Sequence, residues 1–206
     1  MSLPAERELP DAVFVEDAAV VTDEVAIIPR MGALSRRPET AALIDTLATY
    51  RPIKLLTEPA TLDGGDVLKI GLDLFVGLSQ RTNREGLMQL HDLLAPHNYT
   101  VHPVEVNGCL HLKSACSYLG RNSVLVNRSW IDATQLREFE LIDVPAKEQA
   151  GANALLVNNI VLIPSSFPRT RAVLEKRGFH VETIDLSELQ KAEAGVTCGS
   201  LIFNAR

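Results

Sequence analysis

The sequence lacks the features that would direct it into a membrane or out of the cell. None of its 206 residues belongs to an apolar run long enough to span a bilayer. The first residues also lack a signal-peptide pattern, because Glu6, Glu8 and Asp11 follow Met1 in place of an apolar stretch. We therefore predict a cytoplasmic protein with no membrane partner.

Cysteine is scarce. The three cysteines, Cys109, Cys116 and Cys198, are odd in number, and no two of them form a C-x-x-C pair. This pattern argues against a disulfide framework and against a zinc knuckle. Free thiols fit a reducing compartment, in agreement with a cytoplasmic location.

Metal-like spacing of histidines is absent as well. Besides His111, the histidines are His91, His97, His102 and His180. Their separations do not match the short ligand spacings of zinc sites. We predict no required metal and no other cofactor.

The sequence has no excess of basic charge. It carries 20 Lys and Arg residues against 26 Asp and Glu residues, for a net charge of −6, and the basic residues are scattered. This distribution excludes the basic stripe that nucleic-acid binding requires. The share of hydrophobic residues, 46%, is ordinary for a globular protein, and the length fits one domain covering residues 1–206.

What the sequence does contain is a repeat of strand, strand, helix and strand. The first predicted copy has strands at 18–21, 25–28 and 53–56 and a helix at 38–47, and the second has strands at 67–70, 74–77 and 99–104 and a helix at 83–94. The third copy has a hairpin that turns at 120–122, a helix at 133–139 and a strand at 141–144. The fourth has a hairpin that turns at 158–159, a helix at 170–177 and a strand at 180–184. A fifth copy would begin at Cys198, with the run 201–203 as its first strand. Repeats of this length are typical of solenoids, propellers and arrays.

Each copy opens with a polar residue. These residues are Asp17, Asp66, His111, Asn153 and Cys198, at spacings of 49, 45, 42 and 45. If the copies close into a ring, the five side chains converge on one axis and form a central site. The alternative is that they are only the polar residues that start hairpins.

Cys198 is the candidate nucleophile. It follows the small, polar segment Gly195–Thr197 and precedes the apolar run Leu201–Phe203, which places a thiol at the mouth of a predicted strand. The alternative is a small core cysteine.

Six segments resemble those of a known family. They are Asp11–Asp17 (DAVFVED), Leu34–Arg37 (LSRR), Leu62–Leu68 (LDGGDVL), Phe75–Asn83 (FVGLSQRTN), Leu110–Ser114 (LHLKS) and Thr197–Cys198. In order and spacing, the sequence is similar to the dimethylarginine dimethylaminohydrolases of the pentein group. The resemblance implies an α/β fold, a five-bladed propeller of ββαβ modules that here lacks part of one module at the N-terminus.

The resemblance also implies an activity and its catalytic residues. The small-molecule substrate would be N-methylated arginine, hydrolysed to citrulline and dimethylamine or methylamine through a covalent thiouronium on Cys198. His111 would protonate the leaving amine and then activate water. Asp63 would orient His111, although it also fits a turn-forming Asp before Gly64 and Gly65.

Five further residues match the substrate-binding positions of the family. They are Asp11, Glu16, Asp17, Arg36 and Arg81. Glu16 and Asp17 would bind the guanidinium group, Asp11 the α-amino group, and the two arginines the α-carboxylate. Asp66, beside Gly64 and Gly65, has a structural interpretation instead.

Two departures from the family bear on these expectations. The family ordinarily has about fifty more residues before the position of Ala12, which carry part of a module and a lid loop. Without them, we expect the segments 13–15 and 201–203 to face a gap, the activity to be weak, and open strand edges to favour a homo-oligomer. The segment Ala192–Ala194 also replaces an Asp-Gly pair of the family.

Two alternative functions stay open. One is an arginine deiminase or amidinotransferase of the same fold. The other is a weakly active guanidine-binding protein.

Overall fold

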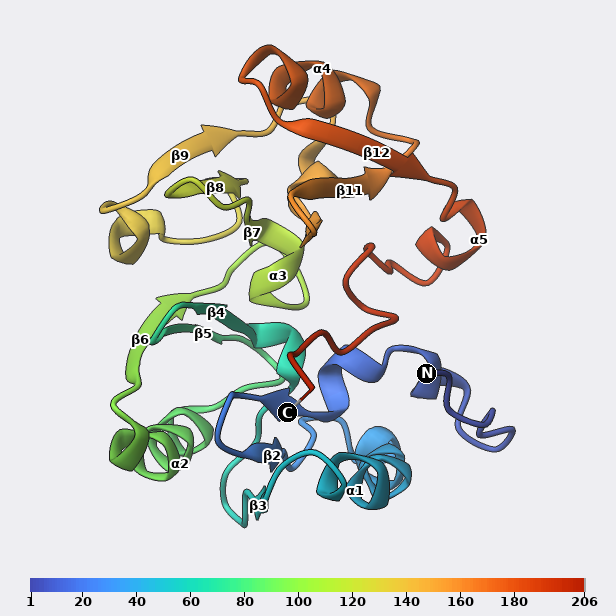
Figure 1. The fold of residues 1–206 in the computed structure, drawn as a ribbon, viewed down its shortest axis with the longest axis vertical. Coiled ribbons are helices and arrows are strands. Elements are labelled where there is room, and N and C mark those ends of the chain that lie inside the picture. Colours follow the sequence, from blue (N-terminus) through green and yellow to red (C-terminus); the bar gives the residue numbers. More distant parts are fainter. Residues whose placement is uncertain (206) are drawn as a thin grey trace. The chain divides into compact units, whose positions relative to one another are not determined.

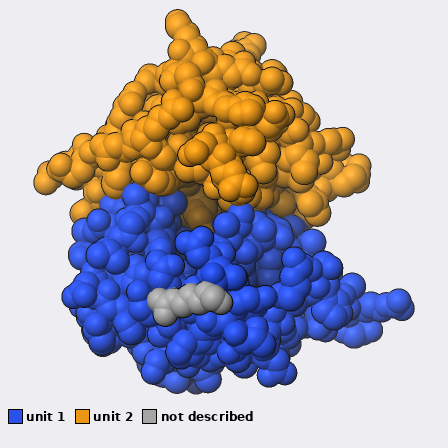
Figure 2. All heavy atoms as spheres, viewed as in Figure 1, with its two compact units in different colours: residues 1–103, 198–206 blue, residues 104–197 orange. Residues whose placement is uncertain are grey.

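The structure, a computed structural model, describes residues 1–205 (Figure 1). It forms two compact units (Figure 2). Unit 1 comprises residues 1–103 together with the C-terminal segment from Cys198, and unit 2 comprises residues 104–197. Among the described residues, no helix has both the length and the apolar character to cross a membrane.

Unit 1 contains two three-stranded sheets. The first has the order β1-β2-β3 (Val20–Val21, Ala26–Ile28 and Ile53–Leu55), with α1 (Ala41–Ala48) between the second and third strands in the chain. The second has the order β4-β5-β6 (Val67–Ile70, Asp73–Leu78 and Thr100–Glu105), with α2 (Arg84–Leu94) in the same position. The last two residues of β6 belong to unit 2.

Unit 2 repeats this arrangement. One sheet has the order β7-β8-β9 (Cys116–Tyr118, Ser123–Val126 and Glu140–Asp143), and the other has the order β10-β11-β12 (Leu155–Val157, Ile160–Pro164 and His180–Ile184). In both sheets the first two strands are antiparallel and the third runs parallel to the second. The predicted ββαβ repeat is therefore confirmed in its strand order.

The connecting helices differ between the two modules of unit 2. α4 (Pro168–Lys176) is a regular helix, whereas the helix predicted over 133–139 is only the 3₁₀ helix Ala133–Leu136. The short helix α5 (Ser187–Gln190) follows β12.

Local sequence explains the hairpins and helix starts. The β10–β11 hairpin turns on Asn158 and Asn159, which have φ values of 50° and 64°, in the left-handed region that such tight turns require. α2 begins after Asn83, whose side-chain oxygen accepts a hydrogen bond from the backbone N–H of Gly86 at 2.8 Å.

A helical turn precedes the first strand of every module. These turns are the 3₁₀ helices Val15–Ala18, Gly64–Asp66 and Gln149–Ala152 and the one-turn helix α3 (Leu112–Ala115). Four of the predicted module-opening residues lie in or next to them, and all four are buried: Asp17, Asp66, His111 and Asn153. The repeat thus places one buried polar group before each first strand.

The cores lie between these sheets and their helices. In unit 1, one cluster of buried residues includes Ile27, Leu62, Leu74 and Leu90, and a second includes Ile28, Met31 and Leu43. In unit 2, the cluster around Leu125, Ile163 and Leu174 joins the two sheets of that unit.

The predicted strand 201–203 is wrong, and the apolar segment 13–15 is helical. Residues 13–15 fall on the 3₁₀ helices Pro10–Val13 and Val15–Ala18 and the residue between them, and residues 201–203 have no strand assignment. The side chains of Val15, Leu201 and Phe203 pack against the cluster of Met31 and Leu43, so these apolar runs contribute to packing without strand pairing. The predicted count of five modules, the missing part of one module and the single catalytic domain stay predictions.

Candidate active site

The predicted site residues are divided between the two units. Unit 1 holds seven of them, Asp11, Glu16, Asp17, Arg36, Asp63, Arg81 and Cys198. Unit 2 holds His111.

Within unit 1, the turn that carries Glu16 and Asp17 is tied to Cys198. The backbone N–H of Glu16 donates a hydrogen bond to the carbonyl oxygen of Cys198 at 3.1 Å. Glu16 and Asp17 are both buried, whereas Cys198 is half-buried and its thiol is not in a disulfide. Two carboxylates are thereby held beside the backbone of the candidate nucleophile.

The turn Gly64–Asp66 packs closely against the same segment. A Cβ atom at Gly64 would overlap the carbonyl oxygen of Glu16. The backbone N–H of Gly65 donates to Asp17 Oδ1 at 3.0 Å. Glycine at position 64 is therefore required for this approach, and one oxygen of Asp17 is fixed by a backbone donor.

Arg36 is enclosed by protein acceptors. Its Nη1 donates to Asp17 Oδ2 at 2.6 Å, and its Nε lies 3.1 Å from both carboxylate oxygens of Glu39. Its Nη2 donates to Glu39 Oε2 at 2.8 Å and to the carbonyl oxygens of Asp11 and Phe14 at 3.2 and 3.3 Å. The N–H groups of Nε and Nη2 are thus directed to the protein itself.

The charge of Arg36 is secured by these contacts. Burial acts to lower its pKa, but the hydrogen bonds to Glu39 and Asp17 and the negative charges of the two acids raise the pKa above its usual value. Arg36 stays a cation, and only 5% of the residue is exposed.

Arg81 has different surroundings. Its Nη1 is buried and has no hydrogen-bond partner within the described part of the chain, and this atom lies 3.8 Å from Asp63 Oδ2. About a quarter of its side chain, 24%, is exposed. Arg81 thus presents a buried donor that a bound acceptor can satisfy.

A buried carboxylate organises the loop of Arg81. Asp66 Oδ2 accepts hydrogen bonds from Ser79 Oγ at 2.6 Å and from Thr82 Oγ1 at 2.7 Å. Ser79 Oγ in turn accepts from the backbone N–H of Arg81 at 3.0 Å. Asp66 therefore holds the backbone of this loop, as its structural interpretation anticipated.

Asp63 is completely buried next to this loop. Its Oδ1 accepts from the backbone N–H of Gly32 at 2.9 Å, and its own N–H donates to Thr82 Oγ1 at 3.2 Å. A Cβ atom at Gly32 would overlap the backbone of Arg81, so the backbone of Gly32 lies directly against that of Arg81 and also contacts the side chain of Asp63.

In unit 2, His111 occupies the residue before α3 and is buried. Its carbonyl oxygen accepts from the backbone N–H of Ser114 at 3.0 Å and from Cys109 Sγ at 3.2 Å. Helix α3 thus fixes the backbone from which the imidazole projects.

Cys116 is unsuited to the role of nucleophile. Burial raises the pKa of its thiol far above the ordinary value, the neighbouring Cys109 raises it further, and Lys113 opposes the shift only weakly. Cys116 therefore stays protonated and serves as a core residue.

For Asn153, the sequence predicted no role beyond its place in the repeat. Its Nδ2 donates to the carbonyl oxygen of Lys113 at 2.8 Å and to Thr197 Oγ1 at 2.9 Å, and its Oδ1 accepts from the backbone N–H of Thr197 at 3.2 Å. A Cβ atom at Gly195 would overlap this amide. Within unit 2, Asn153 thus joins the segment after His111 to the segment that leads into Cys198, and its position in the repeat was the available signal.

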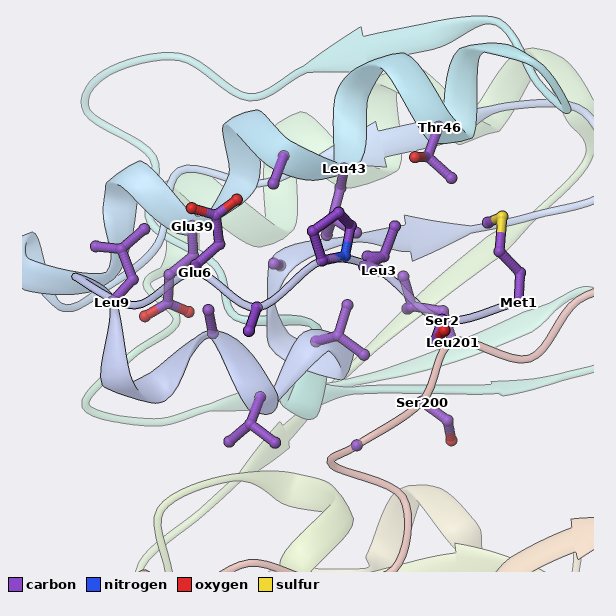
Figure 3. Close-up of a pocket in the computed structure, with 18 of the residues that line it drawn as sticks. Met1, Ser2, Leu3, Glu6, Leu9, Glu39, Leu43, Thr46, Ser200 and Leu201 are labelled. Carbon is purple, nitrogen blue, oxygen red and sulfur yellow. The ribbon is translucent and has the colours of Figure 1, made fainter.

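A cavity of about 620 Å³ lies within unit 1 (Figure 3). Its walls come from the N-terminal residues, from α1 and the 3₁₀ helix before it, and from Gly199–Leu201. Most of the wall is apolar, and Glu39 is one of its few charged residues. The cavity therefore reaches Glu39, which is a hydrogen-bond partner of Arg36.

Sequence comparison relates the chain to known proteins. The model of the arginine deiminase family matches residues 7–159. A dimethylarginine dimethylaminohydrolase of Pseudomonas aeruginosa is 36% identical over 203 residues, which are 98% of this chain and 80% of that protein. The corresponding protein of Streptomyces coelicolor is 40% identical over 196 residues, 94% of this chain and 75% of that protein. The chain belongs to the dimethylarginine dimethylaminohydrolase family.

Solved structures of this family have the same fold. The Pseudomonas aeruginosa enzyme, as a Cys-to-Ser variant in complex with citrulline, superposes with a TM-score of 0.91 at 35% identity, covering 96% of this chain and 78% of that one. A His-to-Gly variant, as an adduct with S-methyl-L-thiocitrulline, superposes with a TM-score of 0.92 at 35% identity, covering 96% and 79%. The predicted family and its pentein fold are therefore confirmed.

Proposed function

We propose that this protein hydrolyses N-methylated L-arginine to L-citrulline and the corresponding amine. The observation that carries the proposal is the pair of buried carboxylates, Glu16 and Asp17, on a turn that is hydrogen-bonded to the backbone of Cys198 through the N–H of Glu16. Carboxylates bind the planar donors of a guanidinium group in pairs. Relatives in the same family have been crystallised with citrulline and with a thiocitrulline adduct, which supports this substrate class.

In the proposed reaction, Cys198 acts as a thiolate and attacks the guanidinium carbon. A carbon–sulfur bond forms, and the tetrahedral adduct then breaks its bond to the methylated nitrogen, which leaves as an amine after His111 gives it a proton. Water, deprotonated by His111, attacks the thiouronium carbon, and cleavage of the carbon–sulfur bond releases citrulline and restores the thiolate. The steps are balanced without a cofactor.

The remaining residues bind the substrate or orient groups in this proposal. Asp11, which is exposed, would accept from the α-amino group, and Asp63 would orient His111. Arg81 would supply the α-carboxylate contact, because its buried Nη1 has no acceptor among the residues described. For Arg36, the hydrogen bonds to Asp17 and Glu39 favour a further task, the holding of Asp17.

A substrate panel tests the proposal. Purified protein should release citrulline from asymmetric dimethylarginine and monomethylarginine, and Cys198→Ala should abolish this release. Cys116→Ala is the matched control, because this thiol is buried and protonated, and it should retain turnover. Activity that survives Cys198→Ala would contradict the mechanism.

Arginine deiminase activity is the second candidate, since the matching family model carries that description. Release of ammonia and citrulline from unmodified arginine, faster than the reaction with methylarginines, would favour it. Self-association and a cytoplasmic location stay predictions, and size-exclusion chromatography of the purified chain tests the first of these.

A further inference from the structure

We propose that Glu39 is a specificity-determining residue: it balances the charge of Arg36, so that the cluster around Asp17 keeps a net negative charge toward a cationic substrate. This inference rests on the proposed function, in which Glu16 and Asp17 receive a guanidinium group. Glu39 makes its contacts through Arg36 and is a positioning residue, not a catalytic one.

The contacts form a chain of three charges. Glu39 is linked to Arg36 through both Nε and Nη2, at 3.1 and 2.8 Å, and Arg36 is linked to Asp17 at 2.6 Å. All three residues are buried, with 5% or less of each exposed. Charges this close and this shielded interact strongly, because little water screens them.

The balance of charge decides what Asp17 can bind. Asp17 and Arg36 alone form a neutral pair, so the buried guanidinium of Arg36 would offset the attraction of Asp17 for a substrate guanidinium. Asp63, whose carboxylate lies within 4.8 Å of that of Asp17, is a second buried acid nearby and is the same in the native chain and in the Glu39 variants. With Glu39 in place, Asp17, Arg36 and Glu39 together carry a single negative charge. The cluster then attracts a cation while Asp17 remains held by Arg36 and by the backbone N–H of Gly65.

The local backbone explains why Glu39 can do this. Arg36 and Glu39 are three residues apart in the 3₁₀ helix Leu34–Thr40, where side chains at this separation lie above one another. Glu39 also lines the cavity described above, whose wall is largely apolar and contains one further acidic side chain, Glu6, near Glu39 (Figure 3). The buried carboxylate of Glu39 therefore interacts with Arg36 with little screening by water.

The test compares two ligands that differ in charge at the reacting end. L-Arginine carries a guanidinium cation, whereas L-citrulline carries a neutral urea group and has the same α-amino and α-carboxylate groups. Calorimetric titration of both ligands into a Cys198→Ser background measures binding without turnover. We expect Glu39→Gln to weaken arginine binding about tenfold and citrulline binding less than about twofold, a change that corresponds to the loss of one nearby charge. Glu39→Asp, which keeps the charge, should retain the native ratio of the two affinities.

The matched control is Glu148→Gln in unit 2. Glu148 is also a buried glutamate, and it accepts hydrogen bonds from Arg169 N, Thr170 N and Thr170 Oγ1 at the start of α4. Its substitution should lower the melting temperature but leave the ratio of arginine to citrulline affinity unchanged. Equal weakening of both ligands by Glu39→Gln, or an unchanged ratio, would overturn the inference.

A second variant decides the case in which Glu39→Gln does not fold. Arg36→Met combined with Glu39→Gln removes the buried pair of Arg36 and Glu39 together, and Asp17 is then the one charged member of the cluster left, held by the backbone N–H of Gly65. The net charge of the cluster is then the same as in the native protein, so the preference for arginine should persist; its loss would overturn the charge argument. Failure of the native chain to release citrulline would contradict the proposed function alone, because the affinity ratio is measured without turnover.

Discussion

Arg36 and Arg81 lie in the same unit, but each has a buried acid that acts on it in a different way. Glu39 and Asp17 bind the guanidinium group of Arg36 directly, whereas Asp66 binds the hydroxyl groups of the loop that carries Arg81. As a result, the side chain of Arg36 is occupied by the protein, and the Nη1 atom of Arg81 lacks a hydrogen-bond partner in residues 1–205. In the first case the acids bind the arginine side chain itself. In the second case the acid holds the backbone of the loop, and the arginine keeps one buried nitrogen without a hydrogen-bond partner in the described residues.

Arg36 and Arg81 share one predicted role, the binding of the substrate α-carboxylate, but their surroundings favour different contributions to stability and binding. A buried, fully bonded ion pair contributes to stability through the cost of breaking it, while an incompletely bonded donor contributes to binding through the partner that it gains. Substitution of Arg36 should therefore change mainly the stability of unit 1. Substitution of Arg81 should change mainly the affinity for substrate.

The largest effect is expected for Arg36→Met. It leaves Asp17 and Glu39 buried without their common cation, and we expect a loss of about 3–5 kcal/mol in the free energy of unfolding. Urea denaturation measures the loss. The matched control is Arg128→Met, which breaks the exposed ion pair with Asp143 and should cost less than about 1 kcal/mol. Similar losses for the two variants would show that the Arg36 cluster does not behave as a buried pair.

A smaller effect, on a different quantity, is expected for Arg81→Ala. The substitution should lower the free energy of unfolding by less than about 1 kcal/mol, because Nη1 makes no hydrogen bond in the described chain. It should raise KM for methylarginine and reduce kcat/KM by an amount equivalent to about 1.5–3 kcal/mol, with little change in kcat. Steady-state kinetics measure both constants. A lowered kcat at an unchanged KM would contradict the assignment of Arg81 to substrate binding.

Much of the fold was predictable because its signals are local. The strands Val67–Ile70 and His180–Ile184 were predicted with the bounds that the structure gives, since apolar residues and turn residues delimit both. The positive φ values of Asn158 and Asn159 likewise follow from residue type at a hairpin turn. These elements depend on neighbours within a few positions.

The wrongly predicted strand 201–203 and the apolar segment 13–15 show the limit of local sequence signals. Residues 13–15 and 201–203 are short and apolar, and such runs fit a strand or a packed coil equally well. Whether such a run forms a strand depends on what it contacts. Here Val15, Leu201 and Phe203 pack against a cluster of unit 1 formed by distant residues. No pattern within either run contains that information.

The same limit applies to the candidate site. Membership of a family motif pointed to Arg36 and Asp17, but their ion pair joins residues 19 positions apart and depends on the folded turn. The contact between Arg36 and Glu39, which are three residues apart, can be predicted only if residues 34–40 are known to form a 3₁₀ helix. The roles of these residues therefore remain proposals that the substitutions above test.

The smallest effect is expected for Ser79→Ala, which tests whether the hydrogen bonds of this side chain position the loop of Arg81. Ser79 Oγ donates to Asp66 and accepts from the backbone N–H groups of Arg81 and Thr82, at 3.0 and 3.3 Å. Its loss leaves one carboxylate oxygen with fewer donors and two N–H groups without this acceptor, which should cost about 1 kcal/mol of stability. Because the backbone of Arg81 is then less well held, KM should rise severalfold while kcat stays the same.

Ser129→Ala is the control for this last prediction. Ser129 Oγ makes a comparable local hydrogen bond, to Asn127 Oδ1 at 2.6 Å, within unit 2. It should lower the melting temperature by a similar amount without a change in KM. If Ser79→Ala also leaves KM unchanged at reduced stability, then Asp66 and Ser79 only stabilise the loop, and the position of Arg81 does not depend on them.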